Sequence, residues 1–484
     1  MTEVDETTIV FVAHLDMELE KLTGRPGDRT KVLDDITLQL LEGETLGIVG
    51  ESGSGKSVLL KAIAGLVPVN SGAVYFETPP EFMYKAVELE KEYVRGAKSA
   101  DGSVPQAVES ISPELSDLRN RFSIIGKSLR KTRKSRKEIY FVFQGSRTAI
   151  DPKKTVWDTI AESFKRGTDL NKSEIDLRIK EVAEAAGLRE SDLQKYPNDM
   201  NVEELQIVNI ARALAVEPKL GILDEPTSDM DISAKAQILN TLRDYQYSRG
   251  MSYIVASNDL NVIRVLSDRV AVMYLGKIVE YSTLSNIYSG MLHPYTKKLI
   301  SNSITLENGK GLIDSQIGDR SPVIPSIPAG CAFHTRCPVA FKNCGWTAAE
   351  VAPLIREIMI LNKNTDLSNF PPYHEIIPGP ETNSLKMTFE GGTHISYEFV
   401  GELNRLIEAR VLLEGGTPLQ AVESVVVSPA GDFVTIQMLK PRVPKLMEVR
   451  PGHFASCFQY GGLDEPQEKP PEEAEKQTNE VEAT

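Results

Sequence analysis

The sequence lacks the features of membrane-spanning, secreted and nucleic-acid-binding proteins. Its 484 residues contain no run of about 18 apolar residues, so no segment is expected to span a bilayer. The chain begins with polar and acidic residues such as Glu3 and Asp5, which are not typical of a secretory signal, and the expected compartment is the cytoplasm. A formal net charge of -14 disfavours a surface for nucleic acid, so no nucleic-acid partner is expected.

Cysteine is also scarce, because the chain has only four and all lie in its C-terminal third. In a reducing compartment such a group indicates a metal site before it indicates disulfides. Cys331, Cys337 and Cys344 have the spacing C-x5-C-x6-C, and Cys457 completes a possible set of four. Four thiolates can hold a zinc ion or a 4Fe-4S cluster, and unliganded buried thiols are a third interpretation.

What the sequence does contain is a glycine-rich loop, GESGSGKS, at residues 50–57. It follows the apolar run Thr45–Val49 and leads into an apolar helical pattern, which is the context of a phosphate-binding P-loop. Glycines let backbone N–H groups approach a phosphate, and the following helix adds its positive N-terminal end. Lys56 is expected to reach the β- and γ-phosphates of ATP, and the Ser57 hydroxyl to bind Mg²⁺. The predicted ATP-binding residues are Gly50, Ser52, Gly53, Ser54, Gly55, Lys56 and Ser57.

Two later apolar runs read as buried parallel strands that carry polar side chains at their carboxyl ends. Leu220–Leu223 leads into Asp224 and Glu225, and Ser252–Ala256 leads to Asn258 two residues later. Such strands indicate an α/β core. The antiparallel strands expected before the loop are residues 9–15 and 33–41.

Two segments read as insertions into this core. Residues 77–138 show two runs with helical spacing and predict an antiparallel helical hairpin. Its basic end, Lys127–Lys137, is either a solvated helix end or a docking surface for an acidic partner. Residues 346–450 read as a small α+β insert, and the acidic tail at 463–484 should be disordered. The elements expected in the insert are helices 348–361 and 400–414 and strands 385–389, 394–399, 424–427 and 433–438.

These motifs together resemble the ABC-type ATPases, and more narrowly the ATP-binding subunits of oligopeptide, dipeptide and nickel importers. The resemblance covers roughly residues 9–344 without the hairpin. It rests on GETLGIVGESGSGKS (Gly43–Ser57), Gln144, Tyr196, ARALAVEPKLGILDEPTSDMDISAKAQIL (Ala211–Leu239), DRVAVMYLGKIVE (Asp268–Glu280), HPYTKKLI (His293–Ile300) and GCAFHTRCPVAFKNC (Gly330–Cys344).

The resemblance implies a P-loop ABC nucleotide-binding domain over residues 1–300, with an antiparallel β subdomain and a helical subdomain. An importer-type extension with cysteines would follow at 301–345. The family pattern places a fourth cysteine soon after this extension, whereas here the insert intervenes before a return segment at 451–462. Related importer subunits use such a cysteine set for an iron–sulfur cluster, so the resemblance favours 4Fe-4S over Zn²⁺.

The resemblance also implies roles for residues around the nucleotide. Asp224 would bind Mg²⁺ together with Ser57 and Gln144, and Glu225 would polarise the attacking water. The aromatic residue that stacks on adenine in the family is not evident here. The adenine contact is therefore expected to be apolar, through Val32.

Two elements depart from the family pattern. The signature helix starts with L-S-G-G followed by Gln or Met in the family, and Met200–Glu204 occupies that place here. A carboxylate of Glu203 or Glu204 at ~5 Å from a phosphate charge costs about 3 kcal/mol at an effective dielectric of ~20, more than one hydrogen bond of about 1 kcal/mol recovers. The switch histidine is replaced by Asn258, which loses a charge-assisted bond worth about 1.5 to 3 kcal/mol, so hydrolysis should be roughly 10- to 150-fold slower.

The resemblance therefore implies an ATP-binding, weakly hydrolysing subunit that energises an oligopeptide-type importer at the cytoplasmic face of the cell membrane. Its expected partners are a second ABC ATPase subunit in an asymmetric heterodimer, two membrane permeases and a substrate-binding protein. An active homodimer that tolerates both changes is the alternative arrangement. Two other functions stay open: a soluble ATP-driven activation subunit, similar to the ATPase component that helps activate methyl-coenzyme M reductase, and a nucleotide sensor without turnover.

Overall fold

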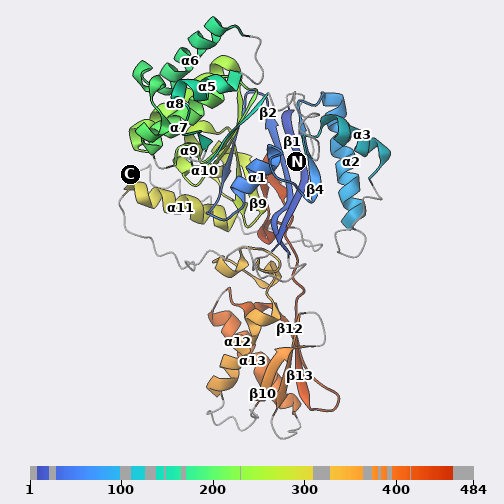
Figure 1. The fold of residues 1–484 in the computed structure, drawn as a ribbon. Coiled ribbons are helices and arrows are strands. Elements are labelled where there is room, and N and C mark those ends of the chain that lie inside the picture. The colour runs from blue at the N-terminus through green and yellow to red at the C-terminus, as the bar shows by residue number, and fades with distance from the viewer. Residues whose placement is uncertain are drawn as a thin grey trace, which may run out of the picture.

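The protein is described here from a computed structural model, which covers residues 8–20, 29–98, 111–125, 138–145, 149–164, 170–228, 230–308, 327–362, 373–379, 383–389, 395–414 and 416–461. The nucleotide-binding core forms the larger part of the molecule, and a smaller C-terminal module projects from one end of it (Figure 1). Within the described ranges, no helix is both long and apolar enough to cross a membrane.

An eight-stranded sheet lies at the centre of the core, in the order β14-β15-β9-β8-β3-β7-β6-β5. Strands β8, β3, β7, β6 and β5 are parallel, and β9, β15 and β14 extend the sheet with antiparallel pairing. The strands predicted at 45–49, 220–223 and 252–256 are confirmed. The bounds are β3 Thr45–Val49, β5 Ile139–Val142, β6 Leu220–Asp224, β7 Ser252–Ser257, β8 Arg269–Tyr274 and β9 Lys277–Thr283.

Both faces of this sheet are buried, which explains why its strands read as continuous apolar runs. Ile222 and Ile254 pack with helix α1 (Lys56–Ile63) and the antiparallel sheet on one face. Leu223 and Val255 pack with the helical subdomain on the other. The described helices around this second face are α5 Val156–Phe164, α6 Lys172–Ala186, α7 Val202–Leu214, α8 Ile232–Arg249, α9 Leu260–Leu266, α10 Leu284–Ser289 and α11 Pro294–Asn308.

A separate antiparallel sheet has the order β2-β1-β4. The predicted pair at 9–15 and 33–41 is confirmed, and both strands are longer than expected: β1 spans Thr8–Glu20 and β2 spans Arg29–Leu41. The third strand, β4 (Ser71–Phe76), pairs with β1 on its other edge.

The first insertion forms two helices that contact each other and cover the outer face of this antiparallel sheet (Figure 1). They are α2 (Pro80–Lys98) and α3 (Pro113–Phe122), so the described part agrees with a hairpin. The buried Glu90 of α2 holds them together, because it accepts hydrogen bonds from Arg119 of α3 and from Tyr75 of β4. The basic run at 127–137 lies outside the described residues.

The C-terminal module is an α+β unit with a four-stranded antiparallel sheet in the order β10-β11-β13-β12. Helices α12 (Ala348–Asn362) and α13 (Tyr397–Leu413) pack with it in one apolar core. The strand predicted at 394–399 is wrong, because the Ser396 hydroxyl accepts from the Phe399 N–H and begins α13. One strand, β10, was not predicted. The strands are β10 Tyr373–Pro378, β11 Ser384–Phe389, β12 Val422–Val427 and β13 Phe433–Met438.

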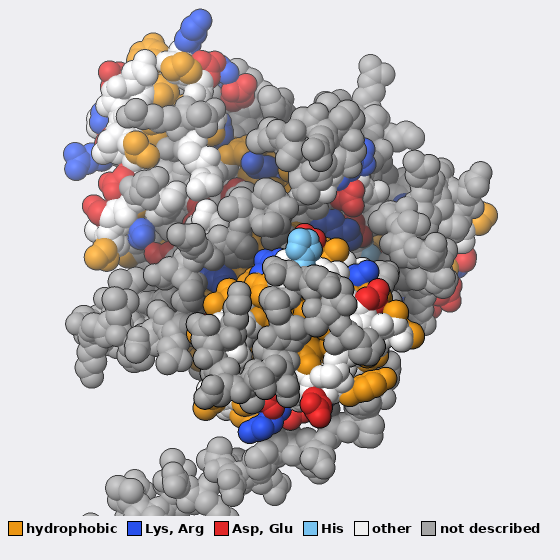
Figure 2. Space-filling view, turned by 90° about the horizontal axis from the view of Figure 1, so that it is seen from below, with side chains coloured by type: hydrophobic (Ala, Val, Ile, Leu, Met, Phe, Trp, Pro, Cys, Tyr) orange, Lys and Arg blue, Asp and Glu red, His pale blue; other side chains and the backbone are white. Residues whose placement is uncertain are grey.

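Hydrophobic side chains are numerous on the surface of this module, as the view from its own end shows (Figure 2). The exposed large apolar residues on its helices and strands are Ile360, Leu361, Tyr397, Leu412, Leu413 and Val426.

The chain returns from the module to the core as β14 (Met447–Arg450) and β15 (His453–Ala455). Strand β14 belongs to the central sheet and begins at Met447, before the insert boundary predicted at residue 450. The two connections of the module meet at Gly330: a methyl group added there would stand 2.6 Å from Gly345 Cα and 3.0 Å from the Arg442 carbonyl oxygen.

Candidate nucleotide-binding site

The phosphate loop links β3 to α1 in a conformation that requires glycine at particular positions. Gly53 and Gly55 have positive φ angles of 82° and 103°, and Gly55 is the N-cap of α1. At Gly50, an added methyl group would stand 2.2 Å from the Met273 carbonyl oxygen. Ser54 is buried and Ser52 is exposed on the same turn, so the predicted residues form one continuous loop at the start of α1.

The Lys56 ammonium is held by the loop itself. It donates to the carbonyl oxygens of Gly50 at 2.8 Å and Glu51 at 3.1 Å, and to Asn258 Oδ1 at 2.7 Å. Burial lowers the pKa of Lys56, while the nearby acidic residues oppose that shift. The lysine therefore stands with its charge beside the loop amides, where a phosphate group would lie.

Ser57 and Asp224 meet at the carboxyl end of the parallel strands. The Ser57 hydroxyl donates to Asp224 Oδ1 at 2.8 Å, and burial raises the pKa of Asp224 against the opposing effects of this hydrogen bond, Lys61 and Lys56. A buried carboxylate next to a hydroxyl is the oxygen donor set that Mg²⁺ prefers. The two residues therefore fit a magnesium site.

Glu225 follows Asp224 at a bend in the backbone, where its φ angle is 49°. Its carboxylate accepts from the Ser257 hydroxyl at 3.2 Å and from the Asn258 N–H at 2.9 Å. Burial raises the pKa of Glu225, and Lys56 opposes the shift. Asn258 thus contacts both Lys56 and Glu225, which places the three predicted residues in one cluster.

Gln144 and Val32 lie at the margins of this cluster. Gln144 is exposed two residues after β5, which pairs with β6 and so ends beside the strand that carries Asp224. The side chain of Val32 is only 4% exposed, and little of it is available to a base. Its carbonyl oxygen instead packs against the loop, 3.0 Å from where a Gly55 methyl group would stand.

The signature sequence of the family lies at the start of α7, and in this protein side chains of the same segment cap that helix end. Asn201 and Glu204 form a capping box: the Asn201 side chain accepts from the Glu204 N–H at 2.8 Å, and the Glu204 carboxylate accepts from the Asn201 N–H at 2.9 Å. Glu203 accepts from the Asp231 N–H at 2.6 Å. The N–H groups of Asn201 and Glu204 at the start of α7 are therefore already bound to side chains of the same chain.

Sequence reasoning missed a link between the cysteine segment and the phosphate loop. Arg336 donates to both carboxylate oxygens of Glu51, at 2.9 and 3.0 Å, and to the Tyr274 hydroxyl at 3.2 Å. The Glu51 N–H in turn donates to the Tyr295 hydroxyl at 2.7 Å. The only sequence signal was an arginine between two cysteines and an acidic residue inside the loop, far apart in the chain.

The four cysteines come together from two segments, and all are free thiols. Burial raises the pKa of Cys331 and Cys337 to about 12 and of Cys344 to about 11, and neighbouring thiols, Cys457 among them, add to these shifts. A backbone N–H also lies within hydrogen-bonding range of each thiol. Even so, among the residues that the structure describes, no three His, Cys, Asp or Glu side chains stand close enough to hold a metal ion.

The fold and this cluster define a P-loop ATPase. The family model for the ABC transporter matches residues 33–228, and the model for the oligopeptide/dipeptide transporter C-terminal region matches residues 279–344. The chain therefore matches both the ATP-binding domain and the C-terminal region of the importer subunits that its sequence resembles.

Individual relatives agree with these matches. The chain is 34% identical over 330 residues to the oligopeptide transport ATP-binding protein OppF of Salmonella typhimurium, covering 67% of this chain and 85% of that protein. It is 33% identical over 352 residues to the oligopeptide transport ATP-binding protein AppF of Bacillus subtilis, covering 71% and 93%. A solved dimeric ATP-binding cassette in a post-hydrolysis state with ADP and Pi is 22% identical, covers 57% of this chain and 99% of its own, and has a TM-score of 0.45. The protein belongs to the family of ABC transporter ATP-binding proteins.

Proposed function

We propose that this protein is an ATP-binding subunit of an oligopeptide or dipeptide importer and acts at the cytoplasmic face of the membrane. The observation that carries the proposal is that Lys56, Ser57, Asp224 and Glu225 meet in one cluster. The same chain has the C-terminal region of the oligopeptide/dipeptide transporters. The names of the relatives support peptide as the cargo, and with it two membrane permeases and a substrate-binding protein as partners.

In this proposal the chain's own residues divide the work of phosphoryl transfer. Lys56 and the loop amides would hold the phosphates, and Ser57, Asp224 and Gln144 would hold Mg²⁺. Glu225 orients a water through its carboxylate, which the Ser257 hydroxyl and the Asn258 N–H keep in place. When bound, Mg²⁺ would neutralise phosphate charge.

We also propose that the chain hydrolyses ATP slowly and works beside a different ATPase subunit. The side-chain oxygen of Asn258 accepts from Lys56, and its neutral NH2 group can give a γ-phosphate only an uncharged donor. The signature helix is capped by its own Glu204. The partner's intact signature helix would close over the nucleotide held by Lys56. This chain would contribute its own altered signature helix to the nucleotide site of the partner.

Reconstitution tests the import function and the subunit arrangement together. The chain should co-purify with two permeases and a second, different ABC subunit, and native mass spectrometry should give one copy of each ATPase. Peptide with its binding protein should stimulate ATP hydrolysis in proteoliposomes, and Lys56→Ala should abolish ATP binding by this chain. A symmetric homodimer in which both sites hydrolyse ATP rapidly would contradict the proposal. So would a membrane fraction that contains the permeases but not this chain.

The cysteines support a further part of the proposal, a 4Fe-4S cluster held by Cys331, Cys337, Cys344 and Cys457. Four mutually close thiols with backbone N–H groups nearby suit thiolate ligands. The sequence spacing C-x5-C-x6-C lacks the short C-x2-C pair that is typical of zinc ribbons, which favours a cluster over zinc. Protein purified without oxygen should contain about four irons per chain. Zinc, or no metal, in that preparation would reject the cluster.

A further inference from the structure

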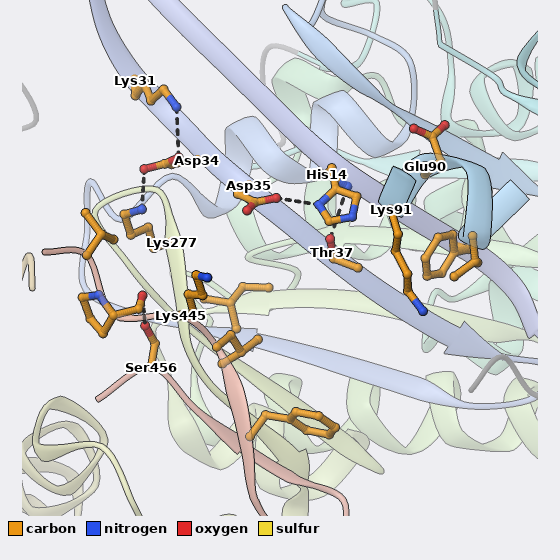
Figure 3. A pocket seen from close by; sticks show the side chains of 17 residues that line it. His14, Lys31, Asp34, Asp35, Thr37, Glu90, Lys91, Lys277, Lys445 and Ser456 are labelled. Carbon is orange, nitrogen blue, oxygen red and sulfur yellow. Dashed lines mark hydrogen bonds and ion pairs between the residues drawn. The ribbon is translucent and has the colours of Figure 1, made fainter. Parts of the chain in front are cut away.

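We propose that a hollow beside the antiparallel sheet binds a small organic anion with an apolar body, at a site separate from the phosphate loop. Its volume is about 590 Å³, within the usual range of ligand pockets. Five segments line it: β1, β2, α2, the start of β9, and residues 443–456 (Figure 3). These last residues begin before the return segment predicted at 451–462, and the name return segment is used for them below.

The hollow is separate from the phosphate loop in its lining, because none of residues 50–57 contributes to it. Phe11 of β1 and Val87 of α2 belong to the apolar cluster between α2 and the antiparallel sheet. Ile278, Leu446 and Phe454 belong instead to the core that contains α1. We therefore expect a ligand in the hollow to bind without displacing nucleotide.

The charge of the hollow is opposite to that of the whole chain. In a protein of net charge -14, four lysines and a histidine line it against three carboxylates. Two of these carboxylates are already bound: Glu90 by Arg119, and Asp34 by Lys31 and Lys277.

Lys91 and Lys445 remain as cations without an ion-pair partner in the described part of the chain, and they come from α2 and from the return segment. The local excess of positive charge calls for an anion.

The polar side of the hollow is held in place by an unusual backbone. His14 and Asp35 both have positive φ angles, 46° and 56°, a conformation that is unfavourable for residues with side chains. They face each other across β1 and β2, with His14 Nδ1 at 2.6 Å from Asp35 Oδ1, at a point where the strand register shifts (Figure 3). Bulges of this kind redirect side chains and are frequent next to binding sites.

The rest of the lining is apolar, which defines the other half of the ligand. Phe11, Val87 and Ile278 are buried at the hollow, and Leu446 and Phe454 of the return segment complete this surface. An inorganic ion would leave these side chains unused. A carboxylate or phosphate ester attached to an aromatic or aliphatic group would contact both surfaces.

Calorimetric titration of the full chain with phenyl phosphate tests this site, in the presence of saturating ADP and Mg²⁺ to occupy the phosphate loop. We expect binding that weakens at least about tenfold in the double variant Lys91→Gln/Lys445→Gln, which loses both unpaired cations. The variant Lys91→Arg/Lys445→Arg should keep it. The matched control Lys153→Gln/Lys172→Gln removes two exposed lysines of the helical subdomain and should not change it.

A second variant distinguishes the contribution of the ligand's apolar group to binding from that of its anionic group. Phe454→Ala should weaken phenyl phosphate and leave the weaker binding of inorganic phosphate unchanged. Absence of phenyl phosphate binding at millimolar concentration, binding that ADP displaces, or an equal loss in the control variant would each overturn the proposal.

Discussion

Burial changes the chemistry of the four thiols independently of any metal. A pKa of about 12 at Cys331 leaves roughly one thiol in ten thousand ionised at pH 8, and only the thiolate reacts. In metal-free protein, iodoacetamide should therefore modify the native thiols much more slowly than the urea-unfolded chain. The rate should rise as the pH approaches 11, because a raised pKa moves ionisation to higher pH. Mass spectrometry of the alkylated protein measures this, and rapid native modification at pH 8 would contradict the burial.

The acidic residues Glu203 and Glu204 at the start of α7 are expected to slow ATP hydrolysis. Glu204→Gln keeps a side chain that can cap the helix, and Glu203→Gly frees the Asp231 N–H. In the proposed two-subunit complex, the double variant should raise ATP turnover about tenfold or more, because it removes charge from the helix start that would face the partner's phosphate. Asp199→Asn, which removes an exposed carboxylate close by, is the control. Unchanged turnover would show that these carboxylates do not limit hydrolysis.

At the scale of elements, the cysteine segment is joined to the phosphate loop by Arg336. Its side chain is only 7% exposed, and it binds Glu51 with two hydrogen bonds. Arg336→Lys keeps the charge but loses the paired geometry, so the loop should be less well positioned and the Kd for ATP about tenfold higher.

A double-mutant cycle shows whether this contact itself carries the effect. Glu51→Gln should weaken ATP binding as Arg336→Lys does, and the double variant should be no worse than either. Arg356→Lys, at an arginine that donates to the Ile376 carbonyl inside the module, should leave ATP binding unchanged. Additive losses would mean that the two residues act separately.

Elements whose ends are set locally can be predicted from sequence. The helix at 172–186 begins at a capping box of Asn171 and Glu174 and ends at Gly187, whose φ is 93°, and all three signals are legible in the sequence. By contrast, β15 has three residues and exists only because it pairs with β9, far away in the chain. The contact of Arg336 with Glu51 could not be predicted for the same reason, because the two residues are far apart in the chain.

The position of the site was largely predictable because its residues are concentrated in short motifs. Lys56, Ser57, Asp224 and Glu225 lie together in the structure, and their roles with ATP and Mg²⁺ stay predictions. The role of Val32 was harder to foresee, since burial of one side chain depends on how β2 packs.

At the scale of the molecule, the C-terminal module should be dispensable for nucleotide binding. Its connections meet at Gly330, so a short Gly/Ser linker can replace residues 346–441 without strain on the core. We expect this deletion to keep ATP affinity within about twofold and to destabilise only the cysteine segment, because the buried His334 loses its contacts with Glu350 and Trp346. Deletion through residue 455 is the matched comparison. It should destabilise the core, because the buried Glu280 then loses its contact with His453.

The position of β15 also affects how the protein is made. Strand β9 pairs with β8 as soon as both have left the ribosome, but its other edge waits for β15, about 170 residues later. At roughly 5 to 20 residues per second, that edge stays open for about 10 to 35 s of synthesis. An unpaired strand edge is a template for aggregation. Chains whose synthesis stops inside the module would keep it open, so premature termination here should yield insoluble protein even though the ATP-binding residues are complete.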